Sequence, residues 1–304
     1  MIITKPASEA GFFVEGAVTR SYQGLMRVTF TKYHALQNDF LVIERGRSAL
    51  SRRRLSALVR AICHRRCGVG ADGVLLVGAS QRAERRVEVV NADGSRAEKS
   101  GNGLRIAALH QHLADRRRRR FLLEMDSQVH EAAVISKDAS CYRLTTTLGR
   151  ACFETSRIPV RCRQRYLINS PLKIGGRSFP VTCLSVGNPH TVLIVDDFDF
   201  DWQTLGAEIE KHQAFPQRTN VEFVKLISRR RLAVADWERG AGATGSSGTG
   251  AAAAVCACVI QGIAERQCRV QFDAGDLEVH WRDDGLIELT GPAAPVACGV
   301  FDYT

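Results

Sequence analysis

Short apolar runs separated by turn residues dominate this chain. Longer stretches at about 51–66, 101–114, 202–212 and 248–264 have the length and composition of helices. Eight shorter runs are rich in β-branched residues and typical of strands: 27–32, 40–44, 73–77, 86–90, 141–145, 181–186, 191–195 and 221–225. The pattern therefore predicts an α+β protein with many short strands and few helices.

A glycine-rich turn occurs twice. Residues 100–103 and 247–250 both read Ser-Gly-x-Gly, lie 147 positions apart and each open a predicted helix. Each is preceded at a similar distance by an asparagine turn, since Asn38 stands 62 positions before Ser100 and Asn188 stands 59 before Ser247. The repetition predicts two similar halves, each a sheet around a central helix.

These two turns have the properties of an anion cradle. The start of a helix presents free backbone N–H groups at a positive dipole end, and glycine lets a ligand approach the backbone closely. Neither turn has the Lys-Ser/Thr end of a P-loop or a dinucleotide fingerprint. One such serine alone would be read as a helix N-cap. Two matched copies favour two helix ends that serve one carboxylate or phosphate ligand.

Length and composition narrow the class of protein. The 304 residues predict about two domains, and 45% hydrophobic with 24% charged residues excludes a disordered, collagenous or coiled-coil chain. The longest apolar stretch, 251–260, is short of the roughly 18 residues that cross a bilayer. The first 25 residues lack the apolar core of a secretory signal. We expect a cytoplasmic protein without a membrane partner.

The formal charge of +10 is partly concentrated in the arginine runs 116–120 and 229–231. No aromatic residues alternate with these runs, and no helix-turn-helix, RRM or zinc-finger spacing occurs. We therefore interpret them as a solvent-exposed loop and strand end, and expect no nucleic-acid partner.

Ten cysteines are expected to be reduced thiols in a cytoplasmic chain of this size. Cys63 with Cys67 and Cys256 with Cys258 lack the paired spacing of a zinc site. We interpret them as core residues and expect no metal site.

Polar turns at 91–94, 187–190, 218–220 and 238–240 flank the two predicted helices and favour a shared site. Together with Lys-Tyr-His-Ala-Leu-Gln-Asn-Asp-Phe at 32–40, Gly-Val-Gly-Ala-Asp-Gly at 68–73 and Asn-Ala-Asp-Gly-Ser-Arg-Ala-Glu at 91–98, they resemble, in order, the motifs of the diaminopimelate epimerase family. The resemblance runs from Met26 to the C-terminus. Proline racemases and phenazine-type isomerases, which share the fold, match less well.

The resemblance implies an α+β fold of two pseudo-symmetric domains, each a curved, mostly antiparallel sheet around a central helix. The N-terminal lobe would comprise 26–146 and 293–304, the C-terminal lobe 147–292, and 1–25 would be an extension. It also implies a cofactor-free active site between the lobes, a small amino-acid substrate and a homodimer.

Family members invert an amino-acid α-carbon with two opposed cysteines, one before each G-x-G turn. Here Ser100 and Ser247 stand at those catalytic positions. The resemblance gives His190 and Glu238 an assisting role in proton transfer. It implies that the following residues bind the substrate: Asn38, Asn91, Gly101, Asn102, Asn188, Asn220, Arg239, Gly248 and Thr249.

Other departures from the family pattern accompany the serines. Ala243 stands where the family usually has Glu, Gly245 where it has Leu and His64 where it often has Asp, so we interpret the serines as natural. The resemblance implies conversion of LL- to meso-diaminopimelate in lysine biosynthesis, impaired or altered by the two serines. The alternatives are a related lyase or isomerase acting on another amino or hydroxy acid, and a non-catalytic amino-acid-binding paralogue.

Overall fold

The computed structural model describes residues 18–20, 26–46, 51–97 and 99–303. The chain forms two compact units, unit 1 (Met1–Thr146 with Gly291–Thr304) and unit 2 (Thr147–Thr290). Of the predicted extension 1–25, only β1 (Val18–Arg20) lies within the described residues. It pairs antiparallel with β2 (Met26–Ala35). One strand, β17 (Leu286–Tyr303), begins in unit 2 and ends in unit 1.

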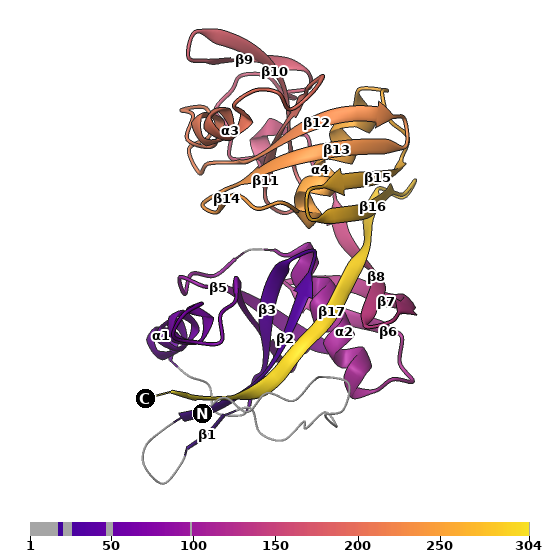
Figure 1. Cartoon of the computed structure of the whole chain (residues 1–304). Coiled ribbons are helices and arrows are strands. Elements are labelled where there is room, and N and C mark those ends of the chain that lie inside the picture. Colours follow the sequence, from indigo (N-terminus) through magenta and orange to yellow (C-terminus); the bar gives the residue numbers. More distant parts are fainter. Residues whose placement is uncertain (1–17, 21–25, 47–50, 98, 304) are drawn as a thin grey trace. The chain divides into compact units, whose positions relative to one another are not determined.

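Unit 1 is a mostly antiparallel sheet with two helical crossovers (Figure 1). The crossover α1 (Arg52–Cys63) joins β3 to its parallel neighbour β4, and α2 (Gly101–Ala114) joins β5 to its parallel neighbour β6. Parallel neighbours require such crossovers. The strands follow one another across the sheet as the end of β17, β2 (Met26–Ala35), β3 (Asn38–Glu44), β4 (Gly73–Gly78), β5 (Arg85–Asn91), β6 (Arg120–Met125), β7 (Gln128–Asp138) and β8 (Cys141–Arg150).

Unit 2 repeats this plan (Figure 1). The helix α3 (Trp202–Glu210) joins β11 to its parallel neighbour β12, and α4 (Gly248–Ile260) joins β13 to its parallel neighbour β15. The strands are β9 (Ser170–Ile174), β10 (Arg177–Ser185), β11 (Pro189–Ile194), β12 (Asn220–Ser228), β13 (Arg231–Glu238), β14 (Gly242–Ala243), β15 (Gln267–Phe272), β16 (Gly275–Trp281) and the start of β17. A short 3-10 helix covers Thr155–Arg157. The predicted α+β fold of two similar halves is confirmed.

The helices α2 and α4 are the centres of their units. Residues 101–110 of α2 and 248–258 of α4 are all buried. The first packs against β2, β6 and β7, and the second against β10, β12 and β16. Four successive alanines at 251–254 have high helix propensity and little bulk, so the sheet can surround α4 closely. Both helices therefore have the central position that the sequence predicts.

The repeated Ser-Gly-x-Gly turn has a local structural cause. The hydroxyl oxygen of Ser100 accepts a hydrogen bond from the N–H of Gly103 (2.9 Å), and Ser247 accepts one from Gly250 (3.1 Å). Each serine thus caps its helix. A Cβ atom at Gly103 would lie 3.1 Å from a Leu75 methyl, and one at Gly250 only 3.0 Å from a side-chain oxygen on β12. The last glycine of each turn therefore lets a strand approach closely.

All eight predicted strands and four predicted helices are present. The strands β1, β6, β7, β9 and β13 to β17 were not predicted. Charged or exposed positions interrupt the apolar pattern in strands such as β7 and β15, and glycines and prolines interrupt it in β17. The arginine runs are exposed, as expected, in a turn before β6 and in the hairpin between β12 and β13. Among the described residues, no helix combines the length and apolar character needed to span a bilayer.

All ten cysteines are free thiols. Cys63, Cys256 and Cys258 are buried, as predicted, but the prediction was wrong for Cys67, which is exposed. Cys67 lies in the turn after α1, where its N–H donates to Nδ1 of His64 (3.0 Å). That hydrogen bond shapes the turn and leaves the thiol outside the core.

Candidate functional site

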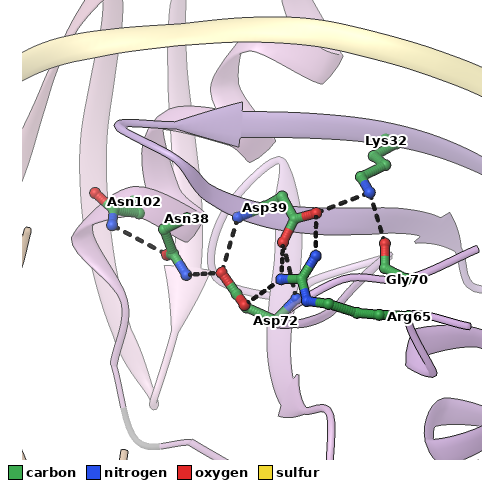
Figure 2. Close-up of polar contacts among 7 residues, drawn as sticks. All are labelled: Lys32, Asn38, Asp39, Arg65, Gly70, Asp72 and Asn102. Atoms are coloured by element: carbon green, nitrogen blue, oxygen red, sulfur yellow. Dashed lines mark hydrogen bonds and ion pairs between the residues drawn. The ribbon is translucent and has the colours of Figure 1, made fainter. Parts of the chain in front are cut away.

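In unit 1, two predicted ligand-binding asparagines are hydrogen-bonded to each other. Asn102, in the first turn of α2, donates through Nδ2 to Oδ1 of Asn38 (3.0 Å), at the start of β3. Asn38 in turn donates through Nδ2 to Oδ2 of Asp72 (2.8 Å) (Figure 2). Because Asn102 follows Ser100 and Gly101 directly, the structure brings these four predicted residues together at the start of α2.

A network of charged side chains lies next to Asn38 (Figure 2). Arg65 contacts Asp39 (2.8 Å) and Asp72 (2.6 Å) through Nη2, and Lys32 contacts Asp39 (2.8 Å). Burial would raise the pKa of Asp39, but hydrogen bonds from Arg65 and Lys32 outweigh it and hold that pKa below its usual value. The motifs at 32–40 and 68–73 thus fix the position of the first asparagine.

Asn91 is placed differently. Its Nδ2 donates to Oγ of Ser95 (3.0 Å), and its backbone N–H donates to the Ser95 carbonyl (2.9 Å). Within the described part of the chain, no hydrogen bond joins its side chain to Asn38 or Asn102. The structure therefore shows Asn91 closing its own turn.

In unit 2, His190 lies between two partners. Its Nδ1 is 2.6 Å from Oε1 of Glu222, and its Nε2 is 2.9 Å from Oδ1 of Asn188. Asn188 donates through Nδ2 to the Thr249 hydroxyl (3.3 Å). His190 and Glu222 are each 1% exposed. Both ring nitrogens therefore have an oxygen partner, and burial raises the pKa of Glu222 although His190 opposes the change.

Ser247 lies beside Glu238, close enough to lower the pKa of that carboxyl. Burial and the neighbouring Asp236 raise the pKa of Glu238 to about 7. Burial likewise raises the pKa of Asp236 to about 6, although a hydrogen bond from Thr244 opposes the change. Ser247 therefore has a carboxyl beside it that gains and loses a proton near neutral pH.

The raised pKa of Glu238 predicts a pH-dependent stability. In the unfolded chain this carboxyl ionises near 4.5, so between about pH 4.5 and 7 the folded state binds more protons. The contribution of the protonated carboxyl to the free energy of unfolding is complete below pH 4.5 and is lost as the pH rises through 7. When the pH is raised from 5 to 8, we expect the free energy of unfolding of Glu238→Gln to rise by roughly 2 kcal/mol relative to that of the parent, a value reduced for solvent screening.

Urea unfolding at the two pH values measures this difference. The matched control is Glu208→Gln, which changes an exposed glutamate of the same unit and should leave the pH profile as it is. Equal pH profiles for Glu238→Gln and the parent would contradict the raised pKa.

Asn220 and Arg239 are linked through the backbone. The Asn220 amide donates to the carbonyl of Pro189 (2.8 Å) and accepts from the N–H of Arg239 (2.9 Å). The Arg239 guanidinium donates to the carbonyl of Gln217 (3.2 Å). Asn220 therefore ties the 187–190 turn to the turn that follows Glu238.

Equivalent strand positions next to the glycine-rich turn carry different side chains in the two units. Phe40 lies two residues after Asn38, as His190 lies two after Asn188, and each begins the parallel pairing of its strand. Leu75 and Glu222 each lie two residues further along the neighbouring strand, against the last glycine of the turn. An apolar pair in unit 1 thus corresponds to an acid–base pair in unit 2.

Backbone N–H groups without a partner in their own helix lie at the start of both α2 and α4. Intrahelical bonding in α2 begins at Leu104, and the Ser100 cap takes the N–H of Gly103. The N–H groups of Gly101 and Asn102 therefore lie outside the helix's own hydrogen bonds. Gly248 and Thr249 stand in the same way at the start of α4, where intrahelical bonding begins at Ala251. Both turns can accept a carboxylate.

Sequence reasoning missed several polar groups near the two glycine-rich turns: Asp72, Arg105, Glu222, Asp236 and Thr244. The available signal was a charged residue inside an otherwise apolar run, as at Glu222 in 221–224. A surface hollow of about 650 Å³ in unit 2 is lined instead by residues such as Phe179 and Phe200, away from the predicted residues. Among the described residues, no group of three His, Cys, Asp or Glu could hold a metal ion.

Comparison with known proteins identifies the family. The family model described as diaminopimelate epimerase matches residues 30–151 and 182–296. The diaminopimelate epimerase of Geobacillus kaustophilus (strain HTA426) is 36% identical over 283 residues, covering 90% of this chain and 97% of the relative. That of Desulfitobacterium hafniense (strain DSM 10664 / DCB-2) is 37% identical over 277 residues, covering 88% and 96%.

Solved structures share the fold at low identity. A hydroxyproline epimerase from Agrobacterium vitis, with bound trans-4-OH-L-proline, superposes with a TM-score of 0.66 at 12% identity, covering 95% of this chain and 92% of that one. A phenazine biosynthesis protein of the PhzF family from Bacillus anthracis gives 0.61 at 13% identity, covering 91% and 99%. With its motifs, its fold and these relatives, the chain belongs to the diaminopimelate epimerase family.

Proposed function

We propose that this protein is a cofactor-independent epimerase that interconverts LL- and meso-diaminopimelate slowly, with Ser100 and Ser247 at the proton-transfer positions. The observation that carries the proposal is the retention of binding groups around both glycine-rich turns, although both turns begin with serine. Asn38 and Asn102 gather at the first turn, and Asn188 and Thr249 at the second.

Unit 2 contains the groups for removing a proton. The α-proton passes to Oγ of Ser247 while the hydroxyl proton passes to the Glu238 carboxylate, and the electron pair stays on the α-carbon. Backbone N–H groups at the helix starts stabilise the carboxylate as negative charge develops on it. Ser100 then gives its hydroxyl proton to that electron pair, which forms the new C–H bond, and solvent water returns a proton to the Ser100 oxygen as Glu238 releases one.

The serines explain why the reaction is slow. A thiol has a pKa near ~8.5, whereas an alkyl hydroxyl is closer to water at ~15.7. The gap of about 7 units corresponds to roughly 10 kcal/mol of proton affinity. With half of it expressed in the transition state, the rate falls by roughly 10³–10⁴ relative to cysteine.

A second candidate function is amino-acid binding without turnover. The observation that favours it is the cap geometry, because each serine oxygen already accepts an N–H of its own helix. In this candidate the serines stabilise the two turns, and the turns hold the ligand's carboxylate.

Proton exchange distinguishes the two functions. The purified protein is incubated in deuterated buffer with LL- or meso-diaminopimelate, and the α-proton signal is followed by NMR. We expect slow loss of that signal with formation of the other isomer. Ligand line broadening without exchange would support the binding function and contradict the epimerase. The absence of both line broadening and exchange would contradict both functions.

A further inference from the structure

Among the residues that the structure describes, Arg105 is the largest fully buried side chain, with 0% exposure. It lies on α2, and its Nη2 donates to Oδ1 of Asn102 (2.5 Å). Its Nε and Nη1 have no hydrogen-bond partner among the described residues. Burial lowers the pKa of Arg105 to about 9, so the guanidinium stays protonated at neutral pH. A buried cation with so few partners opposes folding, which suggests another reason for its presence.

The hydrogen bonds that start at Arg105 all run in one direction. Arg105 donates to Oδ1 of Asn102, whose Nδ2 donates to Oδ1 of Asn38. Asn38 then donates through Nδ2 to the Asp72 carboxylate (Figure 2). A cation thus stands at one end and an anion at the other. Flipping either amide would set two donors, or two acceptors, against each other.

We infer that Arg105 is a positioning residue that sets the amide orientation of Asn102 and Asn38. Each amide then keeps one N–H for the ligand, beside the backbone N–H groups of the first helical turn. Both side chains therefore offer donors to an anionic oxygen. This inference rests on the proposed function for the identity of that oxygen, the α-carboxylate of an amino acid.

Unit 2 provides an internal comparison. The position that corresponds to Asn102 is Thr249, and the one that corresponds to Arg105 is Ala252. A hydroxyl can rotate to suit its partners, whereas an amide has two different ends. The guanidinium is present in the unit whose turn carries an amide and absent from the unit whose turn carries a hydroxyl.

The test replaces Arg105 by methionine, which is similar in length but uncharged. The ligand-free readout is the side-chain NH₂ resonances of Asn38 and Asn102 in ¹⁵N NMR spectra. The second readout is the Kd for meso-diaminopimelate. We expect both pairs of resonances to shift, the Kd to rise at least tenfold, and the melting temperature to stay equal or increase. A purely structural arginine would instead lower the melting temperature.

The matched control is Arg85→Met, because Arg85 donates to Oε1 of Gln111 (3.1 Å) at the other end of α2. It should leave the Asn38 and Asn102 resonances and the Kd unchanged. Arg105→Lys keeps the positive charge on one donor nitrogen in place of the guanidinium and should restore part of the binding. Unchanged asparagine resonances in Arg105→Met would overturn the inference.

Asn102→Asp is the second variant, and it decides the question if Arg105→Met does not fold. The new carboxylate still accepts from Arg105 but has no N–H for Asn38. Shifted Asn38 resonances in a folded protein support the inference that Arg105 acts on Asn38 through Asn102, and unchanged resonances overturn it. Failure of the parent to bind meso-diaminopimelate, with the resonances shifted as expected, would contradict the proposed function and leave the inference supported.

Discussion

Replacing both Ser100 and Ser247 by cysteine is expected to raise the rate of α-proton exchange with diaminopimelate by roughly 10³–10⁴. The thiolate forms far more readily than the alkoxide, and Glu238 already lies beside the Ser247 position. The measurement is NMR exchange in deuterated buffer, with parent and variant at equal concentration. Each single variant should restore only one of the two proton-transfer positions and accelerate inversion less than the double variant.

The same double change should lower stability. Each serine oxygen caps a central helix, and sulfur is a weak acceptor, so each substitution should cost about 1 kcal/mol. The control is the double Ser→Ala variant, which loses the caps without gaining thiols and should show no acceleration. If the cysteine variant exchanges no faster than the parent, the serines are not what limits the rate.

Glu222→Leu alone should destabilise the protein by about 3–5 kcal/mol, whereas the double change His190→Phe with Glu222→Leu should recover most of that loss. The single variant leaves His190 buried without the carboxylate 2.6 Å from its Nδ1. The double variant copies unit 1, where Phe40 and Leu75 hold the corresponding positions at 5% and 0% exposure. Unit 1 therefore shows that these two strand positions can hold a pair of apolar side chains.

A double-mutant cycle by urea unfolding measures this coupling. His190→Phe alone should also destabilise, since Glu222 would then be a buried carboxyl without the imidazole that it contacts. A loss for the double variant equal to the sum of the two single losses would show that the two side chains act independently. The double variant should also lose proton exchange, which separates the role of the pair in the site from its role in folding.

The parts of the structure that depend on local sequence were predictable. Serine caps, glycine turns and apolar periodicity lie within a few residues of one another, so α2 and α4 could be placed from the chain alone. The match between the two glycine-rich turns predicted the repeated fold. It was less predictable which of the motif residues would lie together. Asn38 and Asn91 come from equally clear motifs, yet of these two only Asn38 is hydrogen-bonded to Asn102.

The groups that sequence reasoning missed depend on contacts between distant segments. Arg105 stands in an apolar helix, where one arginine would ordinarily mark the solvent side. Its burial follows only from a sheet that surrounds α2. Glu222 needs a histidine 32 positions away on a neighbouring strand, and Asp72 needs an asparagine 34 positions away. Spacing alone does not encode such pairings.

The path of β17 sets an order of events during synthesis. Unit 2 is one continuous segment, so it can fold once residue 290 has left the ribosome. Unit 1 begins earlier but needs the C-terminal segment, in which residues 294–303 pair with β2 along most of its length. The half of the protein that is translated first is therefore the last to be completed, and until then the edge of β2 is exposed to other chains.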